Sequence, residues 1–426
     1  MSGGWDTGDR DHAEPTGPTP GIVDEGFRLF FPLAAVYAAV WPVIWVVALG
    51  FDLPLATRVS PSLWHAHEML VGAFGAALIG FVTTAAPEWT DTEPLRGRPL
   101  WMLAVLWGAG RVVGAFGWDG MGIAGAVVDL AWMLILIAYL LRLSVLRATD
   151  RLLAFVFWLS ILVMCTAATR FAFASDDMEL ASASVHWIGF AYLGLLGIAL
   201  SRITVPVTNL ILDPSEETAP FRPHPGRVNL APGLVLVALS GDVIGLSPAV
   251  AGFLVCAAGA AFLDRLAEHF IGRAAFRAEI LLLGGASGLA GIGLLMTGAA
   301  RLGAPWSEVA GFHVALMGGL GLGVYAVFCI AGLLHTDRPL GLPAAARAGG
   351  AMLAAAVALR ILPDLGVTLP GPMHGFAALV WAGGFLAWLF AYWPLFRHPG
   401  PARRSHPVEG SFAADGPAIR SRAIAE

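Results

Sequence analysis

The sequence predicts an all-α integral membrane protein, with about twelve transmembrane helices in one bundle and both termini in the cytoplasm. Of the 426 residues, 57% are hydrophobic and only 13% are charged, a composition typical of chains embedded in a bilayer. Apolar runs of bilayer-spanning length recur along the chain, and arginine collects in alternate loops. These three observations together favour a multi-pass membrane protein.

Apolar runs of about 20 residues, the length that crosses a bilayer as a helix, number twelve. The eighth has four polar residues in its last part, Asp264, Arg265, Glu268 and His269, which we expect to neutralise one another. Without this run the count is odd and the two tails lie on opposite sides. The limits of the runs are 27–50, 63–87, 99–117, 121–146, 151–174, 184–211, 228–246, 248–270, 276–300, 306–334, 342–362 and 370–396.

The distribution of arginine supports this count and fixes the orientation. All 25 basic residues are arginine. If the N-terminus lies inside, the inner loops and tails hold most of them, and the outer loops hold little beyond Arg58 and Arg301. This asymmetry follows the positive-inside rule, so both termini are predicted to be cytoplasmic. The net charge of −5 is small for this length, and it predicts no nucleic-acid partner.

The chain divides into a tail at 1–26, a membrane domain at 27–397 and a second tail at 398–426. Both tails are polar and rich in proline, so we expect them to be disordered and cytoplasmic. The first tail lacks the basic start and apolar stretch of a signal peptide. Cys165, Cys256 and Cys329 lie in separate apolar runs without a CxxC spacing. They are predicted to be free buried thiols, neither disulfides nor attachment points for a c-type haem.

The run WHAHEM at residues 64–69 places two imidazoles and a carboxylate at the start of the second apolar run. Such groups at the end of a membrane helix are costly to desolvate, so they are paired, kept wet, or bound to a metal or haem. His65 and His67 are about 200° apart around a helix axis and are expected to face two different partners. Glu68 is three positions after His65, so it is expected to share that face and orient His65 or carry a proton. Ser60 and Pro61 are predicted to start the helix, with Ser60 as its cap.

Other histidines approach the same membrane surface in the predicted topology. His186 and His374 begin apolar runs there, His313 lies about two turns inside another run, and His335 lies near the inner surface. Boundary histidines are commonly solvated or hydrogen-bonded, which is the plain interpretation of His186 and His374. For His313, an interhelical hydrogen bond competes with a role as a ligand.

Asp129 lies well inside the fourth apolar run and needs a partner there. Arg111 of the third run is the predicted partner. A structural ion pair is favoured over a proton relay.

Two segments resemble the NnrS family. The run WHAHEML at 64–70, followed by TAAPEWT at 84–90, is similar to the hallmark segment of that family. The run HVAL at 313–316, with Gly318 and Gly321 and then HTDRPL at 335–340, resembles its tenth-span region. The similarity extends over residues 27–397. The chain departs from the family pattern at 328–331, where FCIA replaces a Thr-Arg pair.

The resemblance implies a multi-pass protein of the bacterial inner membrane that contains haem b and copper and takes part in nitric oxide metabolism or in resistance to nitrosative stress. Nitric oxide is the implied gaseous ligand, and an external electron donor is needed if the protein is redox-active. The resemblance leaves open whether it is an enzyme. His65, His67 and His313 are the expected cofactor-binding residues. The wider set of expected metal ligands is His65, His67, Glu68, His313 and His335 by motif position, with His186 and His374 added from depth alone.

Three hypotheses follow. In the first, His65 and His67 face two separate centres on the outer half of the bundle, of which at least one is a b-type haem or copper site completed by His313, with His186 or His374 as a further candidate ligand. In the second, the histidines line a transient path in a transporter or exporter of a metal, haem or metal–nitrosyl species. In the third, the protein is a structural scaffold with boundary histidines. Stoichiometric cofactor binding separates the first from the other two.

Overall fold

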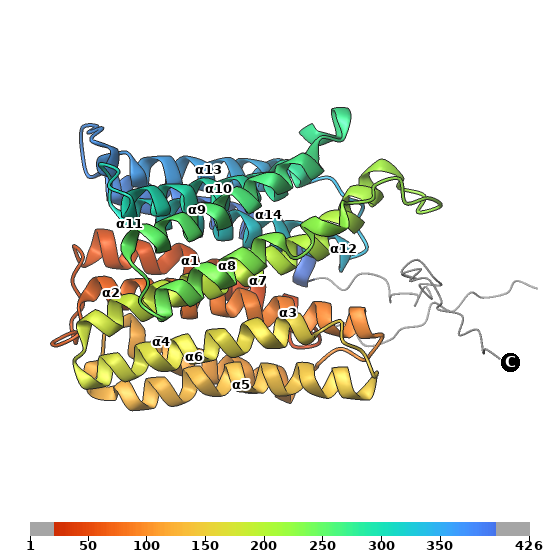
Figure 1. The fold of residues 1–426 in the computed structure, drawn as a ribbon. Helices are drawn as coiled ribbons and strands as arrows, with labels where there is room; N and C mark the ends of the chain where they lie inside the picture. Colours follow the sequence, from red (N-terminus) through yellow and green to blue (C-terminus); the bar gives the residue numbers. More distant parts are fainter. Residues whose placement is uncertain (1–20, 398–426) are drawn as a thin grey trace, which may run out of the picture.

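The computed structural model describes residues 21–397, which form a bundle of helices running side by side (Figure 1). No β-strand occurs in this range. Ten helices within it are long and apolar enough to cross a membrane. The prediction of an all-helical membrane protein is thereby confirmed in this coarser form. The predicted disorder of 1–20 and 398–426 lies outside the described residues.

The first half of the chain builds one side of the bundle. Helices α4, α5 and α6 lie along the lower edge in Figure 1, and α1, α3 and α7 lie between them and the second half. The bounds are α1 Gly26–Val43, η1 Ile44–Ala48, α2 Pro61–His67, η2 Glu68–Phe74, α3 Gly75–Thr90, α4 Arg98–Ala115, η3 Asp119–Met121, α5 Gly122–Leu146, α6 Leu153–Ser175 and α7 Met178–Leu212.

The second half builds the other side, with α9, α10 and α13 along the upper edge in Figure 1. The bounds are η4 Pro225–Arg227, α8 Leu230–Val243, α9 Pro248–Asp264, η5 Arg265–His269, η6 Gly272–Phe276, α10 Ala278–Arg301, α11 Glu308–Phe312, η7 His313–Leu320, α12 Gly321–Leu334, α13 Ala344–Ile361, η8 Pro363–Leu365 and α14 Met373–Arg397.

Two of the twelve predicted spans form helices that do not satisfy the length and hydropathy of a membrane span. The third run forms α4, which carries Arg98 and Arg111 among its 18 residues. The seventh forms α8, which has 14 residues and is about 21 Å long, short of a hydrocarbon core of about 30 Å. The eighth run, which had the most polar end, is among the ten that qualify.

The polar end of that eighth run is neutralised only partly within itself. The Arg265 guanidinium lies 3.4 Å from the carboxylate of Glu268. Asp264 instead pairs with Arg227 of the preceding loop at 2.7 Å. The expected mutual neutralisation is therefore correct for the inner pair, whereas the first carboxylate reaches a neighbouring segment.

The two ends of the described chain lie at the same end of the bundle. The Arg28 guanidinium, in the first turn of α1, donates a hydrogen bond to the carbonyl of Phe396 at 3.3 Å. Since Phe396 is next to the last residue of α14, the chain crosses the bundle an even number of times. The cytoplasmic position of the two termini themselves stays a prediction, because residues 1–20 and 398–426 lie outside the described chain.

Glycines allow the closest helix contacts in the second half. A Cβ on Gly293 of α10 would lie 2.2 Å from the backbone nitrogen of Ala315 in η7, and one on Gly319 would lie 2.6 Å from Ala290. No side chain fits at either distance, so both contacts require glycine. All three cysteines, which lie within 21–397, are free thiols as predicted; Cys165 and Cys329 are buried, whereas Cys256 is only half-buried.

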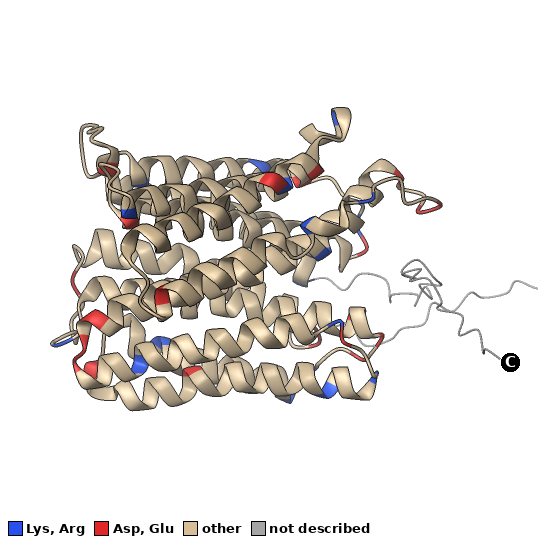
Figure 2. Ribbon diagram, in the orientation of Figure 1, with Lys and Arg blue, Asp and Glu red and all other residues tan. Residues whose placement is uncertain are grey.

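Charged residues gather at the two ends of the bundle, as expected for a membrane protein, and a smaller group lies inside its lower part (Figure 2). This interior group contains the predicted polar residues of the second, third and fourth apolar runs. It is the natural place to look for a functional site.

Candidate functional site

The HAHE segment lies on a helix whose winding changes in the middle of the motif. Residues 61–67 form the α-helix α2, and Glu68 begins the π-helix η2. Pro61 occupies the first turn, as predicted. Ser60 occupies the N-cap position, as predicted, but its hydroxyl lies 2.6 Å from the Ser62 hydroxyl and makes no cap hydrogen bond among the described residues.

The two histidines of this segment face different partners, as their spacing predicted. The His65 ring stacks on the Trp45 indole of η1, with the ring centroids 3.9 Å apart and the planes 12° apart. The His67 ring is fully buried and turns toward the interior, where its Nδ1 lies 3.0 Å from Glu68. Its Nε2 lies 3.6 Å from Asp129.

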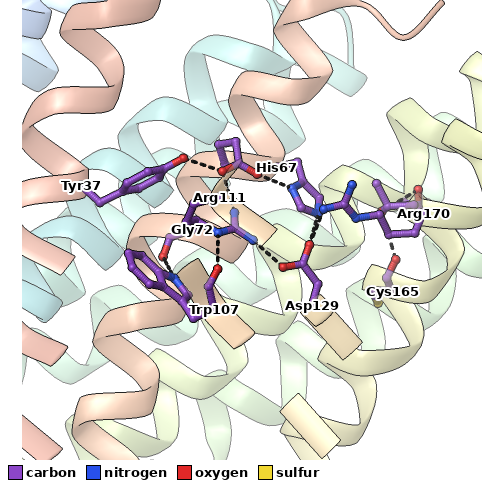
Figure 3. Close-up of polar contacts among 11 residues, drawn as sticks. Tyr37, His67, Gly72, Trp107, Arg111, Asp129, Cys165 and Arg170 are labelled. Atoms are coloured by element: carbon purple, nitrogen blue, oxygen red, sulfur yellow. Dashed lines mark hydrogen bonds and ion pairs between the residues drawn. The ribbon is translucent and has the colours of Figure 1, made fainter. Parts of the chain in front are cut away.

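His67 and Glu68 belong to a buried ion network that joins α2, η2, α4, α5 and α6 (Figure 3). Arg111 of α4 stands at its centre, donating to Glu68 at 2.6 Å and to Asp129. Arg170 of α6 also donates to Asp129. At the other end of the network, the Tyr37 hydroxyl of α1 donates to Glu68 at 2.5 Å.

The predicted role of Glu68 as the residue that orients His65 is wrong. Its carboxylate is held by Arg111, Tyr37 and His67 instead. The physical reason is electrostatic, since a buried carboxylate gains more from a guanidinium at hydrogen-bond distance than from a neutral imidazole on the same helix. The predicted pair of Arg111 and Asp129 is confirmed.

The charges of the network balance one another. Arg111 and Arg170 supply two positive charges, and Glu68 and Asp129 supply two negative charges, so these four side chains balance. Both carboxylates are fully buried and both guanidiniums are at most 5% exposed. A buried set of this kind is tolerated because each charge is paired and hydrogen-bonded. This arrangement makes a structural ion network, in agreement with the interpretation favoured for Asp129.

Glycines in α4 leave the space that the two carboxylates occupy. A Cβ on Gly114 would lie 1.9 Å from a Glu68 carboxylate oxygen, and one on Gly110 would lie 2.3 Å from an Asp129 oxygen. These two glycines flank Arg111 on its own helix. The sequence of α4 therefore provides both the central cation and the room for its two anions.

Arg170 was not predicted, although the sequence holds a sign of it. It is an arginine within an apolar run that ends at 174, and a cation at such a position requires an anion inside the protein. Its guanidinium also lies 5.1 Å from the ring centroid of Trp64. Tyr37 carries no comparable sign in the sequence, because tyrosine is ordinary near the ends of membrane helices.

A second cluster forms around His65, on the other side of the same helix. Electrostatic interactions join His65 with His313 and Arg360, and join His313 with Arg360 and His374. The His374 ring also makes an edge contact with Phe51, with centroids 5.8 Å apart. Three predicted site residues, His65, His313 and His374, thus come together at the end of the bundle where α2, α11 and α14 begin (Figure 1).

The ring nitrogens of this histidine cluster are differently engaged. His313 Nδ1 lies 2.7 Å from the carbonyl of Val309, one turn earlier on its own helix. A carbonyl accepts only from N–H, so Nδ1 carries the proton and Nε2 is left as the basic nitrogen. His65 Nδ1 is buried without a hydrogen-bond partner in the described part of the chain. Imidazole ligands are commonly held in orientation by a contact that leaves one ring nitrogen available. The stack on Trp45 orients the His65 ring, and the bond to the Val309 carbonyl orients the His313 ring.

Three π-helical segments carry or border the residues of this cluster. Trp45 lies in η1, η2 starts directly after the HAH run, and η7 starts at His313. Wide helical turns of this kind are uncommon and are frequently found at functional sites. The sequence did not predict them, because α- and π-helices share the same composition and differ only in local winding.

The remaining predicted residues lie elsewhere. The His186 ring stacks on Phe312, with centroids 4.6 Å apart. His335 lies at the opposite end of the bundle, where its Nδ1 is 3.2 Å from Glu88 and its ring stacks on Phe27. The pairing of His335 with Glu88 brings the two family-like segments together at that end. Neither residue joins the cluster around His65.

Comparison with known families decides the relationship that these segments suggest. A family model described as NnrS protein matches residues 21–399. The chain belongs to the NnrS family. No match is found among curated proteins or among solved structures. The predicted resemblance is therefore confirmed over nearly the whole chain.

The histidine cluster of this NnrS protein offers imidazoles but no ready-made site for a bare metal ion among residues 21–397. No group of three or more His, Cys, Asp or Glu side chains in residues 21–397 is arranged to hold an ion. His65 and His313 are imidazoles, the ligand type that could hold a b-type haem. Arg360 of α13 pairs with Asp364 at 2.7 Å, and its remaining N–H donors could meet a propionate.

Proposed function

We propose that this NnrS protein is a haem- and copper-binding protein of the bacterial inner membrane that acts in nitric oxide metabolism or in resistance to nitrosative stress. The observation that carries the proposal is the meeting of His65 and His313, with His374 beside them, at the π-helical segments η1, η2 and η7. Family membership supports the same assignment.

Within this proposal, His65 and His313 hold the haem, His65 through the nitrogen that is buried without a partner among residues 21–397 and His313 through Nε2. Haem iron, when bound, supplies a site for a small neutral ligand such as nitric oxide. Arg360 binds a carboxylate edge of the group by charge. His374 is the third imidazole at this end and is the proposed copper-side residue, because imidazole suits copper as well as iron.

The ion network acts as a positioning element for this site. It holds η2 to α4, α5 and α6 through Glu68, so that His65 is kept on the side of Trp45. His67 and Glu68 are proposed to act in that network rather than as ligands, since their polar atoms contact one another, Arg111 and Asp129. His186 and His335 are proposed to lie outside the cofactor site, because their contacts are with Phe312 and with Glu88 and Phe27.

The finer topology is also part of the proposal. We propose that α4 and α8 also cross the membrane, packed between neighbouring helices. This gives twelve crossings with both termini cytoplasmic, an even number that agrees with the arginine distribution. The His65 end of the bundle then faces the periplasm. An external donor supplies electrons if the site turns over.

The test compares cofactor content in purified variants. We expect His65→Ala and His313→Ala to lose the Soret absorbance of the haem, because each removes a proposed axial ligand. His224→Ala is the matched control, since His224 lies in an exposed loop far from the cluster. Unchanged haem content in both ligand variants would refute the assignment.

The same preparations address the alternative of a transporter. Loosely held, exchangeable metal together with flux of copper, iron or haem across the membrane of reconstituted vesicles would favour transport. Stoichiometric haem without flux would favour the proposed function.

A further inference from the structure

A cavity lies between α3, α7 and α12, farther along the bundle from the end that carries the histidine cluster. Its volume is about 60 Å³, and its walls include Phe74, Ala77, Tyr192, Leu196 and Leu320. Phe74 is the last residue of η2 and Leu320 is the last residue of η7. The cavity therefore begins where the two π-helices that border the proposed haem site end.

The walls of this cavity are apolar. Every residue that lines it is aliphatic, glycine or aromatic, and the tyrosine contributes its ring. Apolar cavities of this kind stay dry and bind apolar molecules or xenon, because a water molecule inside would find no hydrogen-bond partners. Water, ions and polar metabolites are thus poor occupants.

Partly exposed residues show where the cavity opens. Most of its lining is buried, whereas Phe81, Ala199, Ile203, Val324 and Val327 are half-buried. All five lie inside long apolar helices of the bundle, so the opening faces the hydrocarbon of the bilayer. A solute that dissolves in lipid reaches the cavity without passing through water.

The volume limits the size of the occupant. On the same measure, a cavity needs about 10–15 Å³ to hold one water molecule, and a diatomic molecule is of comparable size. A cavity of about 60 Å³ therefore has room for a small molecule of this kind.

Tyr192 connects the cavity with the ion network. Its ring lines the cavity and makes a ring contact with Phe74. Its hydroxyl is buried, has no hydrogen-bond partner in the described part of the chain and interacts electrostatically with Arg111 and Asp129. Tyr192 thus lines the cavity with its ring and interacts with the network through its hydroxyl.

We propose that this cavity is a binding site for one small uncharged diatomic gas molecule, which enters it from the lipid. It begins at the last residues of η2 and η7. The helix η7 starts at His313, and η2 starts three residues after His65. The inference rests on the proposed function only for the identity of the gas, which is then nitric oxide. Binding of a gas at this place does not require a haem.

Xenon is the probe for this site, because it binds dry apolar cavities and needs no haem or copper. We expect xenon-129 NMR of the purified full chain to show saturable binding. Ala77→Phe fills the cavity from α3, and Val324→Trp blocks its opening from α12. Both are expected to lose the saturable binding. Val105→Trp is the matched control, since Val105 is 65% exposed on α4, and it is expected to bind xenon as the unmodified protein does.

Two results would overturn the proposal. One is the absence of saturable xenon binding in the unmodified protein, including the case in which a lipid chain copurifies in the cavity and blocks it. The other is undiminished binding in both Ala77→Phe and Val324→Trp. Haem content, measured on the same samples, keeps this test separate from the proposed function. Loss of the haem assignment leaves the xenon result intact, and the reverse also holds.

Discussion

Neutralising Asp129 is expected to destabilise the protein far more than neutralising an exposed aspartate. Asp129 is fully buried and accepts hydrogen bonds from both Arg111 and Arg170. In Asp129→Asn the side chain keeps its shape, but two buried cations then face Glu68 alone. One unit of positive charge is left without a counter-ion inside the bundle.

The magnitude follows from the cost of an unpaired buried charge. Two unit charges about 4 Å apart interact by about 4 kcal/mol at an effective dielectric constant of about 20. Breaking a buried pair by removing one partner costs about 3–5 kcal/mol. We therefore expect Asp129→Asn to lower the free energy of unfolding by about 3–5 kcal/mol.

The assay is equilibrium unfolding in mixed detergent micelles, followed by circular dichroism. The control is Asp264→Asn, which breaks the exposed pair with Arg227 and is expected to cost less than about 1 kcal/mol. The double variant Asp129→Asn with Arg170→Met restores a balanced charge and is expected to be less destabilised than the sum of the single variants. Equal costs for the two asparagine variants would refute the ion-network account.

Three further predictions concern the same region. Gly114→Ala is expected to lower the melting temperature, because the added Cβ would collide with a carboxylate oxygen of Glu68. The control is Gly108→Ala on the same helix, whose Cβ meets nothing within 4 Å among the described residues; it is expected to leave the melting temperature unchanged or slightly raised. Equal melting curves for the two variants would contradict this. Tyr37→Phe removes a donor to a buried carboxylate and is expected to cost about 1–3 kcal/mol in the unfolding assay, with no loss of haem. His67→Ala is expected to destabilise the fold but keep haem absorbance, and haem loss without destabilisation would instead make His67 a ligand.

Much of the fold was predictable because it depends on composition and spacing. The membrane runs follow from the cost of placing backbone and charge in hydrocarbon, and they match helices along the chain. The divergence of His65 and His67 follows from helix geometry alone. The pair of Arg111 and Asp129 follows from the need of a buried charge for a partner.

Other features depend on packing that one sequence does not specify. Glu68 was assigned to the wrong histidine because its preferred partner, Arg111, is 43 positions away in the chain. The π-helical turns, which widen the helix at Glu68 and His313, leave no mark in composition. Likewise, the apolar runs predicted α4 and α8 as full membrane spans. The helix α8 has only 14 residues, and α4 carries two arginines among its 18 residues.

The sequence predicted that His65 and His313 meet at one membrane surface, with His186 or His374 beside them, but it did not decide between those two. Their depth placed His65, His186, His313 and His374 at one end of the bundle. Position around the bundle, which separates His186 from the other three, is set by which helices pack together. That order is a tertiary property and was beyond the reach of the sequence.

The most direct test of the haem assignment is the optical spectrum of the purified protein, reduced and oxidised, before and after addition of nitric oxide. The account predicts a Soret band at one haem per chain that shifts with nitric oxide and is lost in His65→Ala. A featureless spectrum in freshly purified protein, with metal only loosely bound, would contradict it.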